Sequence, residues 1–143
     1  MNTPDELPED IQDALEEICD QGNEALDEGE SEEALVFYRQ ALDILPPPAE
    51  SWEVFSYIQA AMGDAFFALN EYAKALECFV TATESNDDKN AFILMRMGQC
   101  HRRLGDDAAA IALLHQAYEI DGEVTFDEDP EDLAFLQSAN VIA

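Results

Sequence analysis

Residues 63–82 read GDAFFALNEYAKALECFVTA, and this stretch sets the pattern that predicts the fold. A glycine opens it, an alanine follows twelve positions later, a large apolar residue stands four positions after that, and a second alanine three positions further on. The same spacing begins again at Gly22 and at Gly98. Three copies of one spacing indicate an internal repeat. The matched residues are Gly22, Ala34, Tyr38 and Ala41, then Gly63, Ala75, Phe79 and Ala82, then Gly98, Ala110, Leu114 and Ala117.

The glycine that opens each copy predicts closely packed helices. Each lies inside a helical apolar pattern, where Gly costs about 1 kcal/mol relative to Ala. We interpret the three glycines as points where two helices approach with no room for a side chain. Gly29 and Gly105 stand seven positions after the first and third glycines, and Asn70 takes that place in the second copy. Because Gly and Asn tolerate the left-handed conformation that ends a helix, each copy is predicted to be a helix–turn–helix unit.

This pattern resembles the tetratricopeptide repeat, a helix–turn–helix unit of 34 residues. In that register the three units span about 15–48, 56–89 and 91–124. The Trp that is typical of the first helix is absent, and its positions hold Ile18, Gln59 and Leu94. The resemblance implies an all-α fold, a right-handed superhelix of three units with a concave groove in which the family binds peptides.

Helical periodicity and helix-breaking residues predict seven helices. They span about 9–28, 31–45, 49–69, 72–84, 89–104, 107–120 and 130–139. The first two units lie seven residues farther apart than one repeat requires, and seven residues are about two helical turns. We therefore expect the third helix to be lengthened at its start, with Trp52 and Phe55 packed against the end of the second helix.

The last predicted helix follows the third unit and has its own start signals. Asp129 stands at the N-cap position and Pro130 in the first turn. We expect this helix to cap the repeats, because the third unit would otherwise expose an apolar side. Residues 9–143 are thus predicted to form one domain, and residues 1–8 an acidic flexible tail.

The charge is extreme and is concentrated at the two ends. The formal net charge is −27, from 33 acidic and six basic residues. Residues 1–33 hold fourteen acids and no base, and residues 119–132 hold eight acids and no base. This balance predicts neither nucleic-acid binding nor membrane insertion. The N-terminus lacks the apolar run of a signal peptide, and three unpaired Cys favour a reducing, cytoplasmic location.

No motif predicts catalysis, a metal or another cofactor. His101 and His115 lie fourteen residues apart without zinc-ligand spacing around them, and His101 occupies a packing position. The three cysteines are expected to be buried apolar residues rather than reactive thiols. The acidic stretch 121–132 lacks the spacing of a calcium loop. The chain is therefore not expected to be an enzyme.

The face of each first helix that points away from the packing stripe is, by the resemblance, the lining of the groove. In the second and third units this face holds large apolar side chains and three of the six basic residues. One interpretation is a groove with apolar pockets for a peptide, basic at one end and acidic at the other, with the arginines binding an acid of that peptide. The other is that neighbouring helices cover the apolar residues and nearby acids pair with the arginines. The predicted groove residues are Tyr57, Asp64, Phe67, Phe92, Met95, Arg96, Gln99, Arg102 and Arg103.

The leading functional hypothesis is a non-catalytic adaptor or chaperone-like module with a protein or peptide partner. The architecture is similar to that of bacterial type III secretion translocator chaperones, which are small acidic proteins with three such repeats. Two alternatives stay open: a homo-oligomeric scaffold, with a homodimer as its simplest form, and an acidic inhibitor of a basic toxin or nucleic-acid-binding protein. Relatives that clamp a C-terminal carboxylate use Lys and Asn in the first unit. Here that unit offers Glu16, Asp20 and Asn23, so that activity is not expected.

Overall fold

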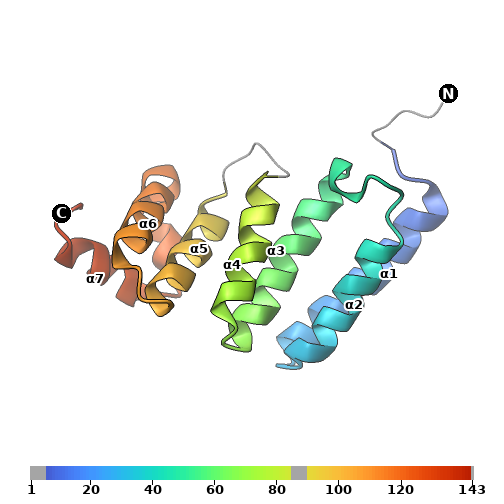
Figure 1. Cartoon of the computed structure of the whole chain (residues 1–143), viewed down its shortest axis with the longest axis horizontal. Coiled ribbons are helices and arrows are strands. Elements are labelled where there is room, and N and C mark those ends of the chain that lie inside the picture. The colour runs from blue at the N-terminus through green and yellow to red at the C-terminus, as the bar shows by residue number, and fades with distance from the viewer. Residues whose placement is uncertain (1–5, 85–89, 143) are drawn as a thin grey trace.

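The computed structural model describes residues 6–84 and 90–142, and it confirms the predicted all-α repeat fold. Three helical hairpins, α1/α2, α3/α4 and α5/α6, follow one another in a row, and α1 and α7 lie at opposite ends of the molecule (Figure 1). The α-helices are α1 (Glu9–Asp27), α2 (Ser31–Asp43), α3 (Glu53–Ala68), α4 (Tyr72–Glu84), α5 (Ala91–Arg103), α6 (Asp107–Asp121) and α7 (Pro130–Ser138). Two short 3₁₀ helices, η1 (Ala49–Ser51) and η2 (Gly122–Phe126), precede α3 and follow α6.

The three repeat glycines are the contact points within the hairpins, as predicted. A Cβ atom on Gly22 would lie 2.7 Å from Cε1 of Tyr38. The equivalent atom on Gly63 would lie 2.6 Å from Cε1 of Phe79, and on Gly98 it would lie 2.8 Å from Cγ of Leu114. Because real Cβ atoms do not approach other carbon atoms so closely, only glycine allows the large residue of the second helix to pack here.

The turns inside the hairpins have one geometry in all three units. Gly29, Asn70 and Gly105 have φ angles of 82°, 63° and 89°, so the left-handed helix ends are confirmed. The residue after each donates its backbone N–H to a carbonyl of the last helical turn, at 2.8 to 2.9 Å. This bond pattern satisfies carbonyl groups that a helix end otherwise leaves open.

The expected extension of α3 at its start is present for only three residues, because the helix begins at Glu53 and the second unit is counted from Ser56. The chain forms the 3₁₀ turn η1 after the prolines, Trp52 is extended, and α3 begins only at Glu53. The indole Nε1 of Trp52 donates a hydrogen bond of 2.7 Å to the carbonyl of Pro46. This bond holds the extra residues as a folded connection, whereas a continuous helix would carry the indole away from Pro46. Trp52 and Phe55 still pack against the core, as expected.

The core is divided into two clusters along the row of helices. The first joins α1 to α4 and includes the fully buried Tyr38, Ile58 and Phe79. The second joins α5, α6, η2 and α7, and Phe126 and Leu136 are buried within it. The packing of α7 against the third unit is therefore as predicted. Asp129 occupies the expected N-cap position, but its side chain makes no capping hydrogen bond.

Two predicted boundaries fall partly outside the described residues, namely the tail at residues 1–5 and the end of the second unit at 85–89. Where the tail is described, it is shorter than expected, because Leu7 packs against the first core cluster. The three cysteines are free and buried, as predicted. Burial raises the pKa of the Cys78 thiol to about 11 and of the Cys100 thiol to about 12, so both stay protonated.

Candidate functional site

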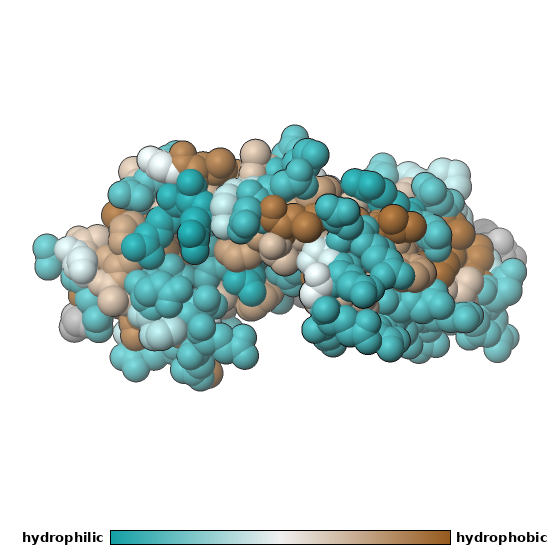
Figure 2. All heavy atoms as spheres, turned by 90° about the horizontal axis from the view of Figure 1, so that it is seen from below, coloured by the Kyte–Doolittle hydropathy of each residue, from teal (hydrophilic) through white to brown (hydrophobic). Residues whose placement is uncertain are grey.

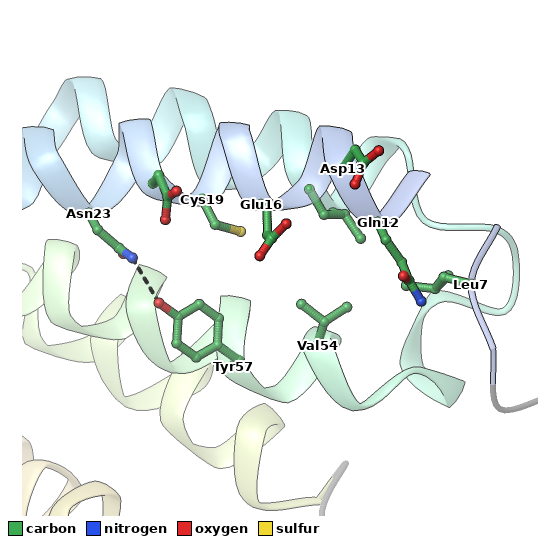
Figure 3. Close-up of a pocket in the computed structure, with 10 residues that line it drawn as sticks. Leu7, Gln12, Asp13, Glu16, Cys19, Asn23, Val54 and Tyr57 are labelled. Carbon is green, nitrogen blue, oxygen red and sulfur yellow. Dashed lines mark hydrogen bonds between the residues drawn. The ribbon is translucent and has the colours of Figure 1, made fainter. Parts of the chain in front are cut away.

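Helices α1, α3 and α5 carry the predicted groove residues, and cavities open beside them. The first cavity has a volume of about 470 Å³ and lies between α1 and the start of α3 (Figure 3). In Figure 3, Val54 and Tyr57 rise from α3 toward Glu16 and Cys19 of α1 across this space. The lining residues are Leu7, Gln12, Asp13, Leu15, Glu16, Cys19, Asp20, Asn23, Val54 and Tyr57.

Carboxylates and apolar groups line different parts of this first cavity. Asp13, Glu16 and Asp20 are exposed, whereas Leu15 and Cys19 are buried. The spacing of three and four residues places the three acids on one face of α1. The cavity therefore combines an apolar floor with an acidic rim.

A hydrogen-bond chain closes one end of the first cavity. The hydroxyl of buried Tyr38 donates to Oδ1 of Asn23 at 2.6 Å, and Nδ2 of Asn23 donates to the hydroxyl of Tyr57 at 2.9 Å. Burial raises the pKa of Tyr38 well above its usual range, so its phenol stays a donor. The chain holds the Tyr57 ring in place, although half of that side chain is exposed to solvent.

The second cavity, of about 360 Å³, lies where α3, α5 and α7 meet. It brings together four of the nine predicted groove residues and two acids of α7 that the sequence analysis did not assign to the groove. Its lining residues are Phe67, Gln99, Arg102, Arg103, Glu131 and Asp132. The two acids belong to the acidic run after α6, but nothing in that run indicated that it folds back onto α5.

Asp132 fills the centre of this second region. Only 3% of it is exposed, and its Oδ2 accepts a hydrogen bond of 2.6 Å from Nε2 of Gln99. Its Oδ1 lies 3.3 Å from Nη1 of Arg102, whose guanidinium also stacks over the Phe135 ring at 4.1 Å. Burial raises the pKa of the Asp132 carboxyl, while the bond from Gln99 and the charge of Arg102 partly offset this effect.

Arg96 is held equally firmly between α3 and α5. Its guanidinium stacks over the rings of Phe67 and Phe92, at 4.8 and 4.9 Å from their centres. Its Nη1 donates to Oε1 of Gln99 at 2.8 Å, and its Nε lies 3.4 Å from Oδ1 of Asp64, an ion pair without hydrogen-bond geometry. Burial raises the pKa of Asp64, and the nearby Arg96 counteracts part of that rise.

The remaining predicted groove residues differ in how accessible they are. Tyr57 is 50% and Phe92 is 42% exposed, so both are open to a partner. Met95 is 1% exposed and belongs to the second core cluster, so its prediction as an open apolar anchor needs correction. It is covered because the chain after α6 folds over α5, and a third cavity of about 330 Å³ there is lined by Phe92, Met95 and the 121–129 segment. Arg103 stacks over the Tyr72 ring at 5.7 Å and is exposed.

Neither a metal centre nor a membrane-spanning segment is found in the described parts of the chain. Residues 6–84 and 90–142 contain no group of three or more His, Cys, Asp or Glu side chains arranged to hold a metal ion. Among the helices of the same residues, none is both long and apolar enough to cross a membrane. Figure 2 shows a face on which hydrophilic side chains cover most of the surface and hydrophobic ones form separate patches.

Comparison with known proteins supports the repeat assignment. Residues 54–123, which hold most of the second and third units, match the family described as the tetratricopeptide repeat. The first unit has the same glycine contact and the same turn as these two. No curated protein matches the chain in sequence. Proteins of the tetratricopeptide class generally mediate protein–protein interactions and are typically not catalytic.

A solved structure has the same fold over nearly the whole chain. It is the N-terminal domain of stress-induced protein-1 (STI-1) from C. elegans, which superposes with a TM-score of 0.67. The match covers 91% of this chain and 97% of that one, at 17% sequence identity. At this identity the likeness shows the fold alone.

Proposed function

We propose that the chain is a non-catalytic interaction module that holds a peptide segment of a partner protein along α1, α3 and α5. The observation that carries this proposal is the exposure of Tyr57 and Phe92 on these helices, each beside a cavity. Large aromatic side chains that stay exposed next to a concavity are typical of sites where a partner covers them. Phe67, at the second cavity, is the third anchor position.

The charged groups of α5 shape this proposal. Arg96 and Arg102 already contact Asp64 and Asp132, so an acid of a partner would have to compete with an acid of the chain itself. Arg103 has no ion pair with any residue that the structure describes, and it remains the one arginine of the predicted three free to take a partner's carboxylate. The apolar anchors therefore contribute more to this interaction than the arginines do.

A binding experiment with matched surface variants tests the proposal. Peptides are selected from a phage-displayed random library on the immobilised full-length chain, and their affinity is measured by fluorescence polarisation. Tyr57→Ala with Phe92→Ala should weaken binding by about tenfold or more, because both anchors are lost. Val36→Ala with Ile120→Ala removes two equally exposed apolar side chains from α2 and α6 and should leave affinity within about twofold.

Thermal melting of each variant provides the control for folding. If no peptide is selected, or if the α2/α6 variant loses as much affinity as the α1/α3/α5-face variant, the proposal is wrong. A concentration-dependent increase in molecular mass that Val36→Ala with Ile120→Ala abolishes would favour the scaffold alternative instead.

A further inference from the structure

We propose that the first cavity, between α1 and α3, receives a lysine or arginine side chain that stands next to a large apolar residue in the partner's segment. This inference rests on the proposed function and specifies the chemistry of the partner. From the sequence, the arginines of the groove are expected to bind an acid of the partner. This inference adds a base of the partner at the acidic end of the groove.

The carboxylates at the rim of the first cavity have no basic partner in the described chain. Asp13, Glu16 and Asp20 all line this space, and within residues 6–84 and 90–142 none of them forms an ion pair. The chain cannot supply a base locally, because residues 1–33 contain none. A cationic group from outside the chain would therefore gain attraction from three acids without displacing an existing partner.

The apolar part of the cavity selects a long side chain with a charged tip. Leu15 and Cys19 are buried beneath the acids, and Val54 and Tyr57 form the opposite wall. Lysine and arginine place their methylene stems on apolar surface and keep their charge at the edge, which matches this division. The exposed Tyr57 ring offers a face on which a cation can stack.

Cys19 completes the apolar base of the first cavity. Cys19 is 7% exposed, its Sγ points into the space in Figure 3, and it makes no hydrogen bond to any described residue. The volume of about 470 Å³ lies within the range of ligand sites, about 300 to 1,000 Å³. It is also larger than a single methyl group.

Other occupants fit the first cavity less well. A bound metal ion needs several ligands in one place, and the described residues present no such group of three or more. Nucleic acids and anionic lipids would be repelled by the acidic rim and by the net charge of −27. A basic, partly apolar peptide segment is the class of partner that satisfies both the rim and the floor.

The experiment uses peptides selected from the phage-displayed library at about 0.15 M salt, where exposed charges beyond about 8 Å are screened. We expect the selected peptides to carry Lys or Arg beside a large apolar residue. Replacing that base with Gln, or neutralising the rim with Glu16→Gln and Asp20→Asn, should each weaken affinity by about tenfold. Combining both changes should cost little more than either alone, because they remove the same contact.

The matched control is Glu17→Gln with Glu24→Gln. These acids lie on the same helix and are exposed, but they do not line the first cavity. The change in net charge is identical, so affinity should stay within about twofold if binding depends on the cavity. An equal loss in both variants would mean general attraction to an acidic protein, and the inference would be overturned.

The two proposals fail in distinguishable ways. Selected peptides that are acidic or uncharged, and that lose affinity with Tyr57→Ala and Phe92→Ala, would overturn the cationic inference and leave the proposed function standing. The absence of any selected peptide that depends on Tyr57 and Phe92 would overturn the proposed function, and the inference with it.

Discussion

The first and second cavities lie beside equivalent helices of the repeat, yet their carboxylates differ: those of the first are exposed, and Asp132 at the second is buried and bound. At the first cavity, between α1 and α3, the carboxylates of Asp13, Glu16 and Asp20 are exposed and without basic partners in the described chain. At the second cavity, Asp132 is 3% exposed and is bound by Gln99 and Arg102. The first cavity therefore has carboxylates exposed to solvent, whereas the carboxylate at the second cavity links α7 to α5.

The difference arises from the elements that adjoin each end of the row. The third unit is followed by α7, which supplies both an acid for Arg102 and apolar side chains for the core. Near the start of α1, Leu7 and the described residues around Trp52 bring no basic group. A charged residue on the inner face is therefore available to a partner only where no later segment of the same chain reaches it.

Removing α7 should have the largest effect, because it would expose the groups around the second cavity that α7 covers. Deletion of residues 126–143 takes Phe126 and Leu136 out of the second core cluster, so we expect aggregation or a large fall in melting temperature. Leu136→Ala alone should cost about 2–5 kcal/mol of the free energy of unfolding. Val124→Ala, at a 64% exposed position nearby, should cost within about 0.5 kcal/mol. An unchanged melting curve for the deletion would contradict the capping role of α7.

Substitutions at the glycine contacts inside the first and third hairpins should destabilise the fold equally, whereas the carboxylates of the two regions should respond differently. Gly22→Leu and Gly98→Leu should each destabilise the fold by roughly 1–3 kcal/mol or more, because the added side chain meets Tyr38 or Leu114. Helix propensity alone predicts the opposite sign, since Leu is the better helix former. Chemical denaturation measures the change. The control is Ala112→Leu on the exposed face of α6, which should be close to neutral.

Deleting one carboxylate from each region should separate the two states directly. Asp132→Ala leaves Gln99 and Arg102 without their acceptor and should cost about 1–3 kcal/mol of unfolding free energy. Asp20→Ala removes an exposed acid without a partner and should change stability by about 0.5 kcal/mol or less. Asp132→Asn keeps an acceptor for Gln99 and should recover part of the loss. Equal effects of the two Ala variants would contradict the distinction.

Acidification should have the smallest effect on stability, and it should act through two acids, the partly buried Asp64 and the buried Asp132. Burial raises the folded-state pKa of Asp64 and Asp132 above the usual value of 3.8. Stability from such groups is fully present below the unfolded-state pKa and is lost as pH rises through the folded-state pKa. The melting temperature should therefore rise as the pH falls from neutral toward the usual carboxyl pKa of 3.8, a change that also relieves the self-repulsion of the net charge.

Asp132→Asn isolates the contribution of one buried acid to this pH dependence. Its pH profile should be flatter than that of the unmodified chain, because the titrating group has been removed. Asp20→Asn, which removes an exposed acid, should leave the slope closer to that of the unmodified chain. A steeper profile for Asp132→Asn than for the unmodified chain would contradict the raised pKa of Asp132.

The repeat was predictable from the sequence because its determinants are local. Gly22, Gly63 and Gly98 mark contacts at a fixed spacing, and the turn residues require a left-handed conformation that few residue types accept. The start of α3 was not predictable in the same way. A hydrogen bond between Trp52 and Pro46 decides it, and periodicity does not encode that bond.

The sequence predicted which helix face lines the groove, but it did not predict which side chains on that face are exposed to a partner. Tyr57 and Phe92 are exposed as that face requires, whereas Met95 is covered by segments that lie beyond the third unit. The partner of Arg102 is Asp132, thirty positions along the chain, and no spacing rule joins residues so far apart. The acids of α1 lie at the acidic end of the predicted groove, but the cavity beside them could not be predicted, because it needs α3 as its second wall.

The most direct test of the account is a map of the peptide footprint. Isotope-labelled protein is titrated with a selected peptide, and the shifts of backbone amide signals are followed by NMR. The account predicts that the largest changes fall on α1, on the start of α3 around the first cavity and around Phe92 of α5, with signals from Asp132 and the rest of α7 nearly unchanged. Changes centred on α7, or on the outer helices α2, α4 and α6, would contradict it.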